Sequence, residues 1–129
     1  MPIGAQVDLA TRQYVWMSPD DERTIRDCLR AAVDGPFFPD WEFHTLIGLD
    51  RDEVAGVLAS WPETSHVEDR TLAVNNVLNN LLGYPHGASE ETWRSYVGAS
   101  PREVADVYAR WRGDDGLDPS GTGYFDRLM

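Results

Sequence analysis

The chain contains no lysine: all eleven of its basic residues are arginine, and twenty-two acidic residues oppose them. The formal net charge of the 129-residue chain is −11. A charge of this sign repels nucleic acids and anionic lipids, so we expect neither to be a non-specific partner. The same charge speeds encounter with surfaces rich in Arg and Lys, which favours a basic protein as the partner.

Cysteine is almost as scarce as lysine. The single Cys28 excludes an intramolecular disulfide. It falls in line with Ile25, Leu29 and Ala32 at helical spacing, which predicts a buried thiol in a helical core.

Long hydrophobic runs are also missing. No stretch approaches the ~20 apolar residues that a membrane helix needs, and the N-terminus lacks the cationic start and apolar run of a signal peptide. We therefore expect a cytoplasmic protein that is not inserted in a membrane. A chain of this length suits one compact domain that buries roughly two-thirds of its unfolded surface.

Motifs of catalysis and metal binding are absent from the sequence. His44, His66 and His86 lie in separate predicted elements, so no two of them share a helical turn as the ligands of an HExxH site do. There is no nucleophile elbow, phosphate-binding glycine loop or CxxC pair. We predict no catalytic residues, no metal and no cofactor, and rank an enzyme as the third alternative.

The sequence is rich in helix start and stop signals. Asp50 with Glu53 and Ser100 with Glu103 form capping boxes, and Pro62 ends a helix. With the apolar periodicity, these signals predict an all-α fold. Its helices are expected at about residues 19–33, 40–47, 51–61, 68–82, 90–97 and 101–112.

Much of the sequence occurs twice. DRDEVAGVLASW at residues 50–61 corresponds to SPREVADVYARW at 100–111, so that Trp61 matches Trp111 and Gly48 matches Gly98. We predict two tandem three-helix repeats, each with a long helix, a short helix and a further helix, packed as one compact domain. The repeats span residues 18–62 and 67–113, between an N-terminal arm (1–17) and an irregular C-terminal tail (114–129). Both tryptophans are expected in equivalent, largely buried places.

The turn between the short helix and the one after it also suggests a regulatory module that binds DNA. A short helix, Gly48, the capping Asp50 and a helix containing Glu-Val-Ala resemble a helix-turn-helix. A recognition helix meets phosphates, however, and here Arg51 stands beside Asp52 and Glu53. A corner used only for packing is the simpler interpretation.

The predicted helical stretch VNNVLNNLLG contains four asparagines, although asparagine has only a modest helix propensity. On a helical projection, Asn76 and Asn80 fall opposite the apolar stripe, whereas Asn75 and Asn79 flank it. The flanking pair either fixes a neighbouring loop by hydrogen bonds or offers a polar contact surface to a ligand or partner.

Three stretches, GPFFPDWEF, LIGLDRDEVAGVLASWP and NNVLNNLLGYPHG, resemble small acidic helical proteins encoded in high-GC actinobacterial genomes. The resemblance covers about residues 18–112. It implies the helical architecture and the cytoplasmic compartment, and it carries over no catalytic residues.

The interpretation that fits these features best is a small acidic binding protein, for example an immunity- or antitoxin-type inhibitor of a basic protein. Aromatic residues expected at the surface are Trp16, Trp41 and Tyr84. The predicted contact residues are acidic, aromatic or polar: Asp20, Asp21, Asp40, Trp41, Glu42, His44, Asn75 and Asn79.

Overall fold

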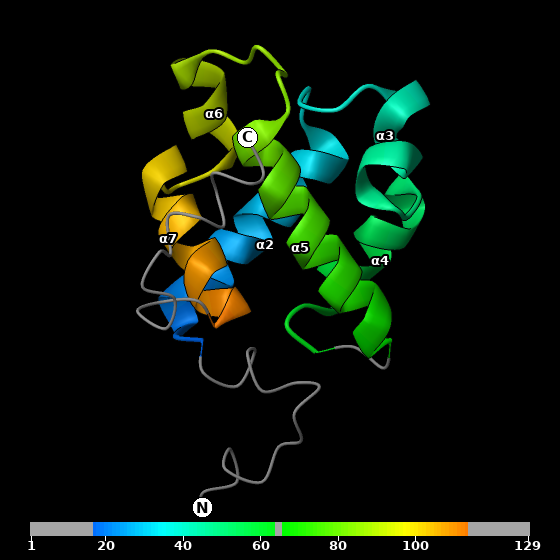
Figure 1. Cartoon of the computed structure of the whole chain (residues 1–129), viewed down its shortest axis with the longest axis vertical. Coiled ribbons are helices and arrows are strands. Elements are labelled where there is room, and N and C mark those ends of the chain that lie inside the picture. The colour runs from blue at the N-terminus through cyan, green and yellow to red at the C-terminus, as the bar shows by residue number, and fades with distance from the viewer. Residues whose placement is uncertain (1–16, 64–65, 114–129) are drawn as a thin grey trace, which may run out of the picture.

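The computed structural model describes residues 17–63 and 66–113. Helices account for all regular structure within these two ranges, which contain no strand (Figure 1). The helices are α2 (Pro19–Asp34), α3 (Asp40–Ile47), α4 (Arg51–Ser60), α5 (Val67–Gly83), α6 (Glu90–Tyr96) and α7 (Pro101–Arg112). The all-α prediction is confirmed, and each predicted boundary lies within one residue of the observed one. The predicted tail, and the arm apart from Met17, lie outside the described residues.

The helix ends form where the capping residues predict them. The side chain of Ser18 accepts the Asp21 N–H at the start of α2, and both predicted capping boxes, at Asp50 and at Ser100, are present. These side chains satisfy backbone N–H groups that have no partner within the helix. Local sequence therefore fixes where these helices begin.

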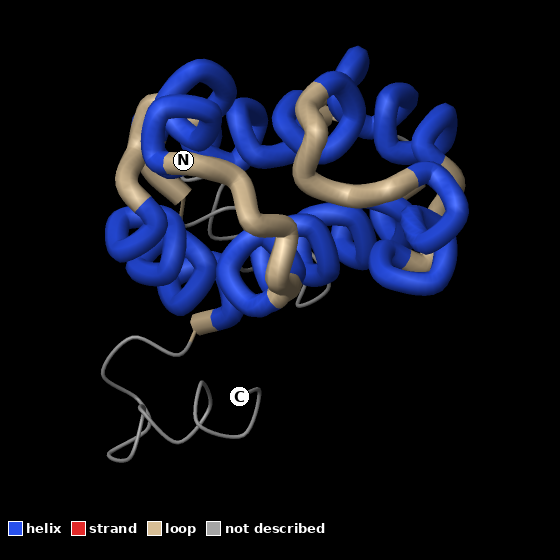
Figure 2. Tube along the Cα trace, turned by 90° about the horizontal axis from the view of Figure 1, so that it is seen from above, coloured by secondary structure: helices blue, strands red, loops and turns tan. Residues whose placement is uncertain are grey.

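The two long helices, α2 and α5, pack against each other and form the centre of the molecule. In Figure 1, α3 and α4 lie on one side of α5, and α6 and α7 lie on the other. Figure 2 shows how the described loops join these helices across the bundle. Because α5 is packed on two sides, most of its circumference faces protein.

The contacts between helices are equivalent in the two halves of the described chain. The first half contains α2, α3 and α4, and these correspond to α5, α6 and α7 of the second half. α2 packs on α4 as α5 packs on α7; α4 contacts α5 as α7 contacts α2; and α3 contacts α5 as α6 contacts α2. The buried positions 43, 47, 54 and 57 likewise recur at 93, 97, 104 and 107. This is the pattern that a tandem repeat requires, and the repeat itself stays a prediction.

Hydrogen bonds connect each long helix to the short helix of the other half. The Asn76 amide on α5 donates to the Ile47 carbonyl at the end of α3, at 2.8 Å. The Asp27 carboxylate on α2 accepts the Gly98 N–H just after α6, at 3.2 Å. These two contacts, which we call the crossed braces, attach each short helix to the opposite half.

The two glycines that follow the short helices differ in conformation. Gly48 has φ of 83°, a left-handed value that favours glycine, and its N–H bonds to the His44 carbonyl. Gly98 is not left-handed, because α6 ends one residue earlier and Val97 already takes an extended conformation. Gly98, which matches Gly48 in the sequence repeat, therefore does not end its helix in the same conformation.

One continuous core joins the two halves. Cys28 is fully buried within it, as its helical spacing predicts, and this burial raises the pKa of the thiol far above its ordinary value. A thiol with a raised pKa is mostly protonated at neutral pH and is a poor nucleophile.

Trp61 and Trp111 are not equally buried, contrary to expectation. Trp111 lies inside α7 and is 5% exposed, whereas Trp61 is half-buried. The difference arises because Pro62 ends α4 at Ser60, so Trp61 lies beyond the helix in an extended conformation. Its indole Nε1 donates to the Glu22 carbonyl of α2 at 3.0 Å.

This difference predicts unequal costs of truncation. Trp111→Ala should lower the free energy of unfolding by about 3–5 kcal/mol, because it leaves a cavity in a closed core. Trp61→Ala should cost about 1–3 kcal/mol, since it removes one hydrogen bond and a partly exposed surface. Urea denaturation followed by circular dichroism measures both. Equal losses would show that the two indoles contribute alike despite their different burial.

Candidate functional site

Trp41 projects from the first turn of α3 into solvent. Its side chain is 80% exposed, while Phe43 and Ile47 on the same helix are buried. Phe43 and Ile47 therefore attach α3 to the core, and Trp41 contributes little to it. The exposed indole combines a large apolar surface with an N–H donor, which is the chemistry that interfaces favour.

The segment that contains Trp41 is strongly acidic. We call residues 40–53 the Trp41 corner. It holds five acidic residues and one Arg, which gives a charge of −4 with His44 neutral. The acidic residues are Asp40, Glu42, Asp50, Asp52 and Glu53. The Gly48 turn and the Asp50 cap join α3 to α4 and so place all five on one helical corner.

The only Arg of the corner, Arg51, directs its donors toward the protein. Its guanidinium lies 4.4 Å from the centre of the Phe43 ring and bonds to Asp40 at 2.6 Å. Asp40 itself remains 93% exposed on its side chain. The other Arg51 bonds go to the backbone carbonyls of Ala32, Val33 and Phe38. Arg51 therefore fixes the end of α2 to α3, and the Asp40 carboxylate faces the solvent.

Two further polar pairs order the corner. Glu42 accepts a hydrogen bond from the Tyr84 hydroxyl at 2.5 Å, and this bond raises the pKa of the phenol. Tyr84 is half-buried, so the exposure expected for it is only partial. His44 Nδ1 lies 2.8 Å from the Asp50 carboxylate, and both side chains are exposed. Asp40, Glu42 and Asp50 of the corner thus each have a polar partner that orients the carboxylate.

Asp20 and Asp21 lie at the opposite end of α2 from α3. Asp34 lies fourteen positions after Asp20 on α2, which corresponds to about 20 Å. Asp21 is buried, and both of its carboxylate oxygens accept from Arg110 of α7 at 2.9 Å. The predicted contact set thus groups residues that the fold separates, and Asp21 serves a contact between helices.

Asn75, one of the two predicted contact asparagines, is bonded within the fold. Its Oδ1 accepts from the Tyr108 hydroxyl at 2.8 Å and from Arg112 at 3.2 Å. Both donors belong to α7, so this asparagine fixes a helix rather than a loop. Asn79, one turn later, is half-buried.

Asn76 and Asn80 do not face away from the protein, so the orientation predicted for them opposite the apolar stripe is wrong. Both are half-buried, and their amides donate to Ile47 and Leu46, the last carbonyls of α3. A projection with one apolar stripe fails here because α5 has helices on two sides. The amides satisfy carbonyls that the end of α3 leaves without intrahelical partners.

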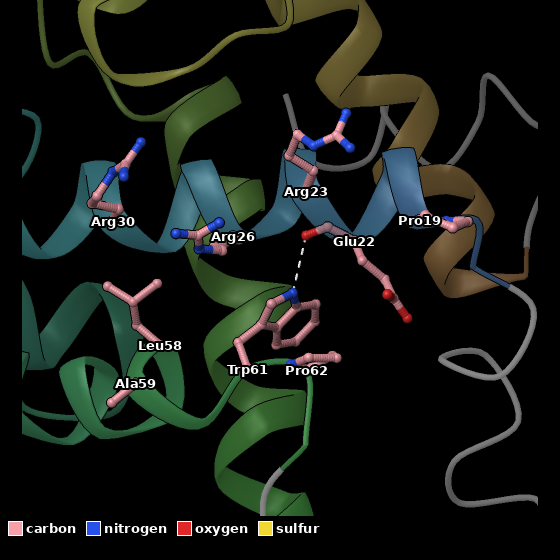
Figure 3. A pocket seen from close by; sticks show the side chains of 9 residues that line it. All are labelled: Pro19, Glu22, Arg23, Arg26, Arg30, Leu58, Ala59, Trp61 and Pro62. Carbon is pink, nitrogen blue, oxygen red and sulfur yellow. Dashed lines mark hydrogen bonds between the residues drawn. The ribbon is translucent and has the colours of Figure 1, made fainter.

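The sequence prediction missed a groove between α2 and the end of α4, of about 570 Å³. Arg23, Arg26 and Arg30 line it from α2, and Leu58 and Trp61 line it from the other side (Figure 3). The signal is present in the sequence, because positions i, i+3 and i+7 share one face of a helix. The overall charge of −11 conceals it, since acidic residues outnumber basic ones along the whole chain.

Comparison of the chain with protein-family models, curated proteins and solved structures gives no match. Within residues 17–63 and 66–113, no three or more His, Cys, Asp or Glu side chains gather in an arrangement that could hold a metal ion. The helices of this part of the chain are also too short or too polar to span a membrane. The functional conclusion therefore depends on geometry and charge.

The pair formed by Tyr84 and Glu42 makes a prediction about pH. Because folding raises the pKa of Tyr84, its contribution to stability is complete below the ordinary value of about 10 and is lost as pH rises through the folded value. Glu42→Ala should therefore destabilise the protein at neutral pH, and the difference from the wild type should shrink above pH about 10. Thermal melts from neutral to alkaline pH, with absorbance titration of the phenols, measure this.

Tyr84→Phe is the matched control, because it removes the same hydrogen bond from the other side. Its melting temperature should follow that of Glu42→Ala across the pH range. A late-ionising tyrosine that persists in Glu42→Ala but is absent from Tyr84→Phe would contradict the assignment.

Proposed function

We propose that this protein acts by binding, and that the Trp41 corner receives a basic protein. The observation that carries the proposal is the 80% exposure of Trp41 within a segment of charge −4. Tryptophan is enriched among the few residues that dominate binding energy at interfaces. An acidic surround complements a partner rich in Arg or Lys.

The arrangement around Trp41 reduces the cost of association. Asp40 is fixed by Arg51 and Glu42 by Tyr84, so the carboxylates of both sequence neighbours of Trp41 are already oriented before a partner arrives. A surface ordered in advance loses less side-chain entropy on binding. The −11 charge of the whole chain adds long-range attraction that raises the association rate.

This surface suits an inhibitor of the immunity or antitoxin type that neutralises a basic protein in the cytoplasm. Such a protein needs charge complementarity and an aromatic anchor and requires no catalytic group, in keeping with the absence of catalytic motifs from the sequence.

Use of α3 and α4 as a DNA-binding helix-turn-helix has less support. The N-terminal turn of α4 carries Asp52 and Glu53, and the Arg51 donors are bonded to the protein itself. In the second half, Arg110 of α7 pairs with the buried Asp21, and Arg112 bonds to Asn75. This leaves Arg102 as the exposed cation of that helix without a partner among the described residues. Phosphate contacts would require free cations at these positions.

The experiment is a pull-down with the tagged full chain from its source cell, followed by affinity measurement with the recovered protein. The recovered partner should have a basic isoelectric point and should bind more weakly as salt shortens the Debye length from ~30 Å at 0.01 M to ~8 Å at 0.15 M. Trp41→Ala should weaken binding by about thirtyfold or more, as truncation of an interface anchor does.

Charge variants provide the matched control. Asp52→Asn lies in the Trp41 corner, and Glu91→Gln removes an exposed carboxylate from α6 in the other half. Asp52→Asn should slow association more than Glu91→Gln does. Recovery of no protein partner, together with tight binding to a defined DNA duplex at physiological salt, would overturn the proposal in favour of the DNA-binding alternative.

A further inference from the structure

The groove between α2 and the end of α4 carries a charge opposite to that of the chain, and we call it the arginine groove. Three Arg and one Glu, Glu22, are the charged residues that line it, which gives +2 within a chain of −11. None of residues 40–53 lines it, so it is a different surface from the Trp41 corner. Three of the eleven basic residues are therefore concentrated on one wall of one groove.

The guanidinium groups of this wall are available to a ligand. Arg26 is exposed and makes no hydrogen bond or ion pair with the described part of the chain. Arg23 and Arg30 each pair with an aspartate three residues earlier on α2, at 3.1 and 3.4 Å. Exposed pairs of this kind contribute little energy, so a better-placed carboxylate can replace them.

The opposite wall is apolar and fixed in position. Leu58 and Ala59 come from the last turns of α4, and Trp61 and Pro62 follow directly. The bond from Trp61 Nε1 to the Glu22 carbonyl holds the indole against α2, as the dashed line in Figure 3 shows. A ligand in the groove would therefore meet Arg26 opposite an apolar surface, while Arg23 and Arg30, which extend away from Trp61 in Figure 3, would turn toward the ligand once released from their aspartate partners.

We propose that the arginine groove binds an acidic peptide segment of a partner protein. Its carboxylates bond to Arg23, Arg26 and Arg30, and an apolar side chain of the segment packs on Leu58 and Trp61. Guanidinium groups bind carboxylates through paired hydrogen bonds. Arg23 and Arg30 are seven helical residues apart, about 10 Å. On an extended peptide, acidic side chains two or four positions apart share one face at about 7 or 13 Å, a range that brackets this spacing.

An acidic peptide fits the groove better than a nucleic acid does. A nucleic acid strand extends beyond the groove, where the remaining charge of the protein repels its phosphates. A short segment with two or three carboxylates and an apolar residue stays within the locally positive surface.

Selection of a random peptide library on the immobilised full chain tests the proposal, with counter-selection on Arg26→Gln. The enriched peptides should combine Asp or Glu with an apolar residue. The best of them, labelled and measured by fluorescence anisotropy, should bind Arg26→Gln at least about tenfold more weakly than the wild type. Its amide analogue, with Gln and Asn in place of the acids, should bind as weakly.

Three controls distinguish binding in the groove from misfolding of the variant and from binding elsewhere on the surface. Because Arg26 is exposed and bonds to nothing in the described fold, Arg26→Gln should melt at the wild-type temperature. Arg94→Gln, which removes an exposed Arg from α6, should leave peptide affinity unchanged. Trp41→Ala should leave the peptide affinity unchanged as well. The result of this test is therefore independent of whether the Trp41 corner binds a basic protein.

Several outcomes would overturn the proposal. Enriched peptides without acidic residues, or equal binding to wild type and Arg26→Gln, would show that the groove is not an acidic-peptide site. A single-stranded oligonucleotide that binds more tightly than the best peptide, and depends on Arg26, would assign the groove to nucleic acid. A dimer in sedimentation that Arg26→Gln dissociates would assign it to a second copy of the chain.

Discussion

The packing of α2 against α5 is the contact on which the rest of the structure depends. The helices of each half are too few to enclose an apolar core, so their buried faces must meet across the molecule. α2 and α5 supply that meeting surface, and every shorter helix rests on one or both of them. Apolar packing is not directional, whereas the crossed braces at Asn76 and Asp27 are hydrogen bonds between defined atoms. They attach the end of each short helix to the opposite half.

Local signals made the helices predictable, whereas tertiary contacts determined the exceptions. Caps at Ser18, Asp50 and Ser100 act within four residues, so sequence alone places these helix starts. The orientation of Asn76 depends on helices arriving from both sides of α5, which no projection of a single helix contains. The partial exposure of Trp61 follows from where Pro62 turns the chain relative to α2.

The candidate site was predictable only in part, for a related reason. Asp40, Trp41, Glu42 and His44 are neighbours in the sequence and remain neighbours in the fold. Asp20 and Asp21 were joined to them by charge type alone, and the length of α2 separates them. Net charge also concealed the arginine groove. A sum over the whole chain does not show where the less numerous basic residues cluster. The protein thus combines an acidic corner and a basic groove, and a partner is selected by the surface that it meets rather than by the total charge.

The crossed braces have a consequence for assembly. Since the long helix of one half holds the short helix of the other, the bonding pattern does not specify that both halves belong to one chain. Two copies that exchanged these halves would form the same braces and bury the same core, so the balance between a monomer and an exchanged dimer would depend on protein concentration.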